Sequence, residues 1–182
     1  MNDFSRSALT LVGGACFTTA LVVASVWDIR SRRIPNWLVL ALAVLGVCYS
    51  ALAQSPSSGG IARALLGLVI GFGMWIPFYA LGMLGAGDVK LFAAASCWLA
   101  PTQVVTAALV AALAGGILSI VGLVLAHGWG LATLRVAHGI RDPKILATPL
   151  AVPKGRKTLP YGLAMTVGLL IVAWFPRWLH LS

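Results

Sequence analysis

Residues 61–84 read IARALLGLVIGFGMWIPFYALGML and decide the fold, because they form one long apolar run whose single charged side chain is Arg63. A helix needs about 20 apolar residues to cross a membrane, and this run provides that length. The whole chain is 60% hydrophobic and 9% charged, with a mean hydropathy of +0.96. A soluble domain of this length could not cover its surface with such a composition. We therefore expect an integral membrane protein.

Further apolar runs accompany this one, and together they predict an all-α polytopic membrane protein with about six transmembrane helices in one domain, residues 1–182. The expected spans are residues 8–27, 37–53, 61–84, 89–100, 104–126 and 161–179. The fourth span is short, because its residues give about 18 Å of helix against roughly 30 Å of hydrocarbon. We expect a short, buried helix that begins below the membrane surface. A segment that enters and leaves on one face is the alternative.

The positive charges gather between the spans. The net charge is +9, from 13 Lys and Arg against four Asp and Glu, and most of the cations lie in the expected loops 28–36 and 127–160 or beside the loop 85–88. Membrane proteins concentrate Lys and Arg in cytoplasmic loops, so we expect these loops on the cytoplasmic side and both termini on the other. Topology accounts for the charge, and we expect no nucleic-acid partner.

Asp28 and Asp88 lie at the edges of apolar runs, where a carboxylate is costly and marks a functional site. Two carboxylates that share a site cannot both ionise cheaply. One can then take a proton from water while the other, protonated, polarises a carbonyl group. We therefore predict that Asp28 and Asp88 form a catalytic pair. The structural alternatives are a helix N-cap for Asp88 and pairing with nearby arginines for Asp28.

This chemistry requires no cofactor, and we expect none. The His and Cys residues of the chain show no spacing typical of metal ligands, so we expect no metal site either.

Gly85 and Gly87 precede Asp88 closely. Glycine lets backbone approach a bound extended substrate and adopt dihedral angles that other residues avoid, so both are expected to shape a peptide-binding cleft. Lys90 follows on the same segment. It is interpreted as an anchor on the cytoplasmic side, with tuning of Asp88 as the alternative.

Pro35 and Asn36 follow Asp28 after a short basic stretch. Pro35 restricts the backbone of the turn, and Asn36 is placed to cap a helix that starts at Trp37. We expect this segment to be rigid and to aim Asp28.

These residues resemble the type IV prepilin peptidase family of membrane aspartic proteases. In that family one Asp precedes an Ile-Pro-Asn segment and the other lies in a Gly-x-Gly-Asp motif. Asp28 with residues 34–36, and residues 85–90, match these elements position by position. The segment of Pro160, Tyr161 and Gly162 resembles the Pro-Tyr-Gly stretch that opens the last span of small family members.

The resemblance implies a multi-pass protease of the bacterial inner membrane with its site facing the cytoplasm. Its implied partners are membrane lipid and a prepilin-like precursor, from which it removes a short basic leader peptide. It is most similar to compact, peptidase-only members of tight-adherence (Flp-type) pilus systems, so methylation of the new N-terminus is not expected. Two alternatives stay open: a proton-coupled carrier or channel subunit, and a non-catalytic assembly protein of a pilus or secretion system.

Overall fold

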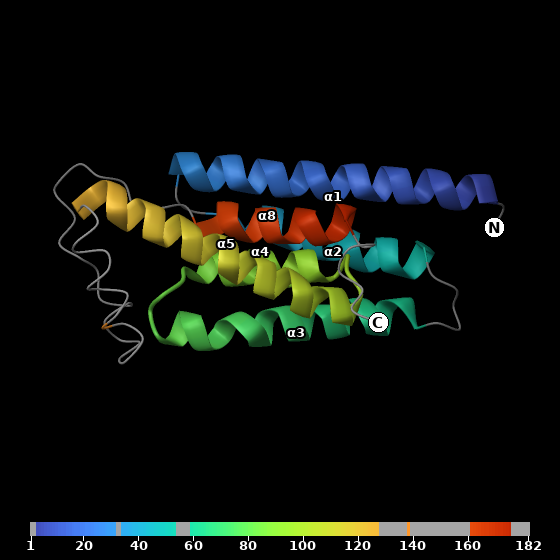
Figure 1. Cartoon of the computed structure of the whole chain (residues 1–182). Coiled ribbons are helices and arrows are strands. Elements are labelled where there is room, and N and C mark those ends of the chain that lie inside the picture. The colour runs from blue at the N-terminus through green and yellow to red at the C-terminus, as the bar shows by residue number, and fades with distance from the viewer. Residues whose placement is uncertain (1–2, 32–33, 54–58, 128–137, 139–160, 176–182) are drawn as a thin grey trace.

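The computed structural model describes residues 3–31, 34–53, 59–127, 138 and 161–175. Six long helical segments in this part of the chain pack side by side in one bundle, which contains no strand (Figure 1). Their bounds are α1 Asp3–Ser31, α2 Asn36–Ala53, α3 Gly60–Ala80, α4 Ala86–Ser96, α5 Pro101–His127 and α8 Tyr161–Trp174. The all-α prediction is confirmed.

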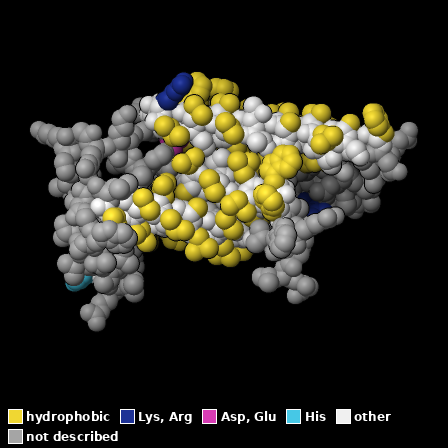
Figure 2. Space-filling view, turned by 45° about the horizontal axis from the view of Figure 1, so that its top comes forward, with side chains coloured by type: hydrophobic (Ala, Val, Ile, Leu, Met, Phe, Trp, Pro, Cys, Tyr) yellow, Lys and Arg dark blue, Asp and Glu magenta, His cyan; other side chains and the backbone are white. Residues whose placement is uncertain are grey.

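Four of these helices are long and apolar enough to cross a membrane, over Ser7–Ser31, Asn36–Ala53, Gly60–Ala80 and Pro101–Val121. Helix α8 is apolar but shorter, and α4 has 11 residues. Large apolar side chains, among them Leu40, Leu113 and Ile117, are exposed on the outside of the bundle. Hydrophobic side chains cover much of the described face in Figure 2. Lipid accommodates such a surface and water does not, and the chain is a polytopic membrane protein.

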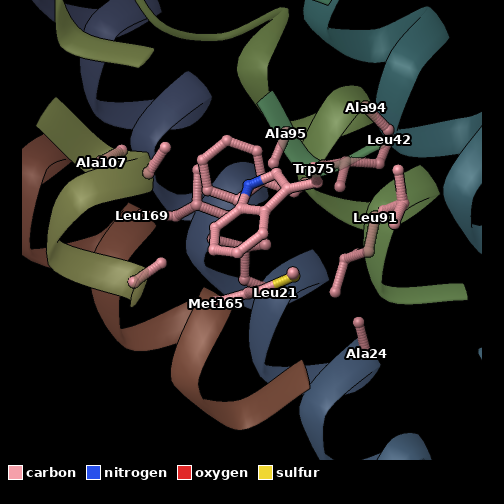
Figure 3. Packing of buried hydrophobic residues seen from close by; sticks show 14 of the residues in the cluster. Leu21, Ala24, Leu42, Trp75, Leu91, Ala94, Ala95, Ala107, Met165 and Leu169 are labelled. Carbon is pink, nitrogen blue, oxygen red and sulfur yellow. The ribbon is translucent and has the colours of Figure 1, made fainter. Parts of the chain in front are cut away.

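Helix α4 lies inside the bundle, because it packs against α2, α3 and α8. Its residues from Leu91 to Ser96 are all buried, in agreement with the expected short, buried fourth helix. Figure 3 shows Leu91 in the same core as Leu21 of α1, Trp75 of α3 and Met165 of α8. The core thus holds α4 from several sides and fixes where its first turn lies.

Helices α5 and α8 pack closely enough for their backbones to touch. A Cβ atom added at Gly168 would lie 2.6 Å from the backbone nitrogen of Ala111. Small residues allow this close approach. Van der Waals packing between the helices then stabilises the pair, because lipid provides no hydrophobic driving force between helices.

Helices α1, α3 and α5 end, and α2, α4 and α8 begin, at the left-hand end of the bundle in Figure 1. The described helix ends that flank the expected cytoplasmic loops therefore lie at this end. Of the loop expected at 127–160, only His127 and His138 lie among the described residues.

Both predicted carboxylates lie in helices, whereas the sequence placed them in loops 28–36 and 85–88. Helix α1 continues through Asp28 to Ser31. Helix α4 begins at Ala86 after the N-cap residue Gly85, which puts Asp88 in its first turn. A polar residue does not end a helix by itself, and an acidic one in the first turn is favoured by the helix dipole. The apolar run therefore marks the membrane part of a helix and misses its polar ends.

Helix α3 ends at Ala80, although its apolar run continues to residue 84. Gly82 has a φ of 73° and donates its N–H to Tyr79, while Met83 donates to Phe78. This is a Schellman motif, in which glycine takes the left-handed conformation just past the helix end. The left-handed conformation of Gly82 ends α3. The hydropathy of the sequence does not indicate this end.

Candidate active site

Asp28 lies in the last turns of α1 and is only 8% exposed. Its Oδ2 atom accepts a hydrogen bond of 3.2 Å from the backbone N–H of Gly162. Gly162 is the second residue of α8, so the carboxylate meets the first turn of a helix, where backbone N–H groups have no partner within the helix. Anions are stabilised at such positions.

Asp88 lies in the first turn of α4, where its own N–H donates to the Gly85 carbonyl oxygen over 3.2 Å. Helix α4 is not among the helices long enough to span a membrane. Burial raises the pKa of the Asp88 carboxyl to about 6, the Asp28 carboxylate raises it in the same direction, and a hydrogen bond from the Gly85 backbone opposes them. A carboxyl with this pKa is partly protonated near neutral pH.

Gly162 brings the two carboxylates together. A Cβ atom added at Gly162 would lie 2.7 Å from Oδ2 of Asp28 and 3.3 Å from Oδ1 of Asp88. Both side chains therefore reach one small volume of space, although they belong to α1 and α4. On the face drawn in Figure 2, a small area of acidic side-chain atoms is visible. Asp28 is nearly buried, and Asp88 is partly exposed.

The segment between α1 and α2 covers the Gly85–Asp88 turn through Ile34. The Ile34 side chain is buried, and its Cβ atom would lie 3.6 Å from a Cβ atom at Gly87. The carbonyl oxygen of Pro35 accepts the N–H of Leu38 over 3.1 Å, so Pro35 precedes the first turn of α2. Asn36 is the first residue of that helix, whereas the sequence predicted it as the cap.

The glycines near Asp88 have ordinary backbone angles, contrary to the prediction. Gly85 has φ −77° and ψ 146°, and the glycines with positive φ in the described chain are Gly59 and Gly82. Gly85 instead gives room, because a Cβ atom there would lie 3.2 Å from Oδ2 of Asp88. Its importance lies in close approach to the carboxylate.

Lys90 and Asn36 lie away from the carboxylate pair. Both line a groove between α2, α3 and α4, and Lys90 is exposed. Lys90 is two positions after Asp88, which turns it by about 200° around the helix axis. Pro160 lies outside the described residues. Tyr161 is half-buried, and its ring packs against α5, where a Cβ atom at Gly115 would lie 2.7 Å from it.

Ser25 and Thr166, which the sequence did not single out, lie directly behind the pair. The hydroxyl of Ser25 donates a buried hydrogen bond of 2.7 Å to that of Thr166, which joins α1 to α8. Ser25 is three residues before Asp28, and Thr166 is four after Gly162, so the bond lies about one helical turn deeper. Polar residues at these spacings inside apolar helices were the signal that could have found them. Within the described chain, no group of His, Cys, Asp and Glu could hold a metal ion.

The chain belongs to the type IV leader peptidase family, whose sequence model matches residues 15–120. This range includes both Asp28 and Asp88 and ends before α8. The predicted resemblance is confirmed.

Two relatives agree with this assignment. The "Prepilin leader peptidase/N-methyltransferase" of Pectobacterium carotovorum subsp. carotovorum is 30% identical over 120 residues, 62% of this chain and 42% of that protein. The "Type 4 prepilin-like proteins leader peptide-processing enzyme" of Escherichia coli O78:H11 (strain H10407 / ETEC) is 31% identical over 111 residues, 56% of this chain and 39% of that protein. The matched part of the chain spans about two fifths of the length of these relatives. No solved structure matches the chain.

Proposed function

We propose that the chain is a membrane-embedded aspartic endopeptidase that removes the leader peptide from type IV prepilin-like, Flp-type precursors at the cytoplasmic face of the bacterial inner membrane. One observation carries the proposal: a carboxylate from α1 and a carboxylate from α4 approach the same point at Gly162. Family membership and the names of the relatives support prepilins as the substrate class. The clustering of Lys and Arg in the expected loops at this end supports the cytoplasmic side.

The two carboxylates have different surroundings, which support different roles for them. Asp28 accepts an N–H group at the start of α8, and such a bond is strongest when the acceptor is ionised. Asp88 has a pKa of about 6, raised first by burial and then by Asp28. Environments that push paired carboxyl groups apart define an acid and a base. We therefore propose Asp28 as the base and Asp88 as the acid.

In the proposed reaction, Asp28 takes a proton from a water molecule, whose oxygen forms a bond to the scissile carbonyl carbon. Asp88 gives its proton to the carbonyl oxygen, so no charged oxygen is left in an apolar site. When the carbon–nitrogen bond breaks, Asp28 passes its proton to the leaving nitrogen. Asp88 recovers a proton from a hydroxyl of the intermediate as the carboxylic acid forms. The mechanism uses no cofactor.

The carrier alternative requires carboxylates along a path through the membrane. Asp28 and Asp88 instead lie near the end of α1 and the start of α4, at one end of the bundle. This favours a site that receives a substrate from one side.

Cleavage of a co-expressed prepilin tests the proposal. Wild type, Asp28→Asn and Asp88→Asn are compared at equal membrane levels, with leader removal followed by gel shift. Asparagine keeps the shape and the capping ability of aspartate but has no transferable proton at neutral pH. We expect each substitution to abolish cleavage.

Near-normal cleavage by either variant would refute the carboxylate pair. Full pilus assembly by both variants, with the prepilin uncut, would instead support the non-catalytic assembly protein. A matched control is Gly116→Ala, because nothing lies within 4 Å of a Cβ atom at Gly116.

A further inference from the structure

A groove of about 420 Å³ lies on the side of α4 that faces α2 and α3. It is distinct from the carboxylate site, because Lys90 of α4 lines the groove, whereas Asp88 approaches Gly162 of α8.

The groove is polar at one end and apolar along the rest. Asn36 and Lys90 form the polar end, near the starts of α2 and α4. Ala43 lies seven residues further along α2, about 10 Å deeper at 1.5 Å per residue. Ala93 and Ala94 follow Lys90 on the same face of α4 and are almost fully buried. These alanines leave a slot that runs from the membrane face into the hydrocarbon.

The walls of the slot open outward. Leu40 of α2 and Phe72 of α3 both line the groove, and they are 65% and 41% exposed. Lys90 is exposed at the mouth and has no hydrogen bond or ion pair to any part of the chain that the structure describes. A cation beside an apolar slot complements a molecule with an anionic head and a hydrocarbon tail.

We propose that this groove binds one anionic phospholipid of the surrounding membrane. The phosphate accepts hydrogen bonds from the Lys90 ammonium and the Asn36 amide, and one acyl chain lies along the alanine slot towards Ala43. Basic pockets between helices on the cytoplasmic side are typical sites for anionic head groups. The lysine stem also reaches readily to the interface. The groove opens to the lipid on the face of α4 opposite the carboxylates, so a peptide seated there would not thereby reach Asp88.

Native mass spectrometry of the full-length protein in detergent tests this proposal. The probe is an equal mixture of phosphatidylglycerol and phosphatidylcholine with identical acyl chains. We expect wild type to retain phosphatidylglycerol preferentially. Lys90→Gln removes the cation and should weaken that retention about five-fold. Ala43→Leu fills the slot and should weaken retention of both lipids.

Arg30→Gln is the matched control, because Arg30 is an exposed cation of α1 outside the groove. It should retain phosphatidylglycerol as wild type does. Thermal unfolding of each variant in the same detergent separates a lost site from a lost fold. If Ala43→Leu does not fold, Ala43→Val, which adds less volume, is tested in its place.

Equal retention of phosphatidylglycerol by wild type and Lys90→Gln would overturn the proposal. So would equal retention of the two lipids by wild type. Displacement of phosphatidylglycerol by an apolar peptide that matches the mature N-terminus of a pilin would assign the groove to the substrate instead. The readout does not depend on peptidase activity, so this proposal and the proposed function fail independently.

Discussion

Gly162→Ala is the substitution that tests the candidate active site most directly, because it keeps both carboxyl groups and changes only the space between them. The new Cβ atom would lie 2.7 Å from Oδ2 of Asp28 and 3.3 Å from Oδ1 of Asp88, and ordinary contact begins at 3.4 Å. The Asp28 carboxylate must therefore retreat by roughly 0.7 Å, more than the Asp88 carboxylate must. Its bond of 3.2 Å to the Gly162 N–H would lengthen or break.

A shift of this size should act mainly on the chemical step. A misplacement of about 1 Å can cost about 100-fold in rate, so we expect kcat to fall between about 10-fold and 100-fold. KM should change little, because neither carboxyl group needs to move far for the substrate to bind. The measurement is steady-state cleavage of a purified prepilin by the purified protein in detergent or lipid.

The control for this experiment is Gly116→Ala on the neighbouring helix α5, where the added methyl group meets nothing within 4 Å. It should cleave as wild type does. If Gly162→Ala unfolds at the same temperature as wild type and its kcat stays within about two-fold, the convergence of the two carboxylates at Gly162 is not the reactive geometry.

Three further predictions follow from the same contacts. Thr166→Val should lower kcat by about 10-fold or less, because it leaves the buried hydroxyl of Ser25 without its partner. Thr166→Ser keeps the hydroxyl and should restore the rate. Equal rates for the two variants would contradict a role of Thr166 in positioning Asp28. The cleavage rate should decline as pH rises through about 6, because the proposed acid Asp88 has its pKa raised to about 6 and loses its proton there. A cleavage rate that stays constant from about pH 5 to about pH 8 would exclude Asp88 as the acid. Gly168→Ala should lower the thermal unfolding temperature, because its methyl group would lie 2.7 Å from Cβ of Ala111. Overpacking of this kind costs roughly 1–3 kcal/mol of stability. An unchanged unfolding temperature would contradict the close packing of α5 and α8.

The sequence predicts the helices well because apolar length is what a membrane demands of a helix. It predicts their ends poorly. Helix α3 stops at Ala80 since Gly82 takes a left-handed conformation, and α1 runs past Asp28 although its apolar run does not. Both ends depend on local backbone geometry and on neighbouring helices. A hydropathy pattern contains neither.

The sequence also predicts the two aspartates as one pair, because a carboxylate beside an apolar run demands an explanation. It could not predict how they are held. The hydrogen bond between Asp28 and Gly162 joins residues 134 positions apart, and it exists because α8 packs between the other helices. Lys90 follows Asp88 closely in sequence, which suggests tuning of Asp88 as the alternative to an anchor on the cytoplasmic side. The helical turn instead places it on another face of α4, where it lines the groove.

The position of α8 connects the packing of the bundle to the proposed chemistry. Gly115 of α5 receives the ring of Tyr161, and Ala111, about one turn away along α5, lies against Gly168, about two turns further along α8. These two contacts fix α8 both along its axis and around it.

Gly162 follows Tyr161 directly, so the N–H group that holds Asp28 is positioned by glycines and alanines that touch neither carboxylate. The small residues of α5 thereby act at a distance on the relative placement of Asp28 and Asp88. A larger residue at Gly115 would move Tyr161 and with it the start of α8, and should impair cleavage while leaving the carboxylates, the water and the substrate chemically unchanged.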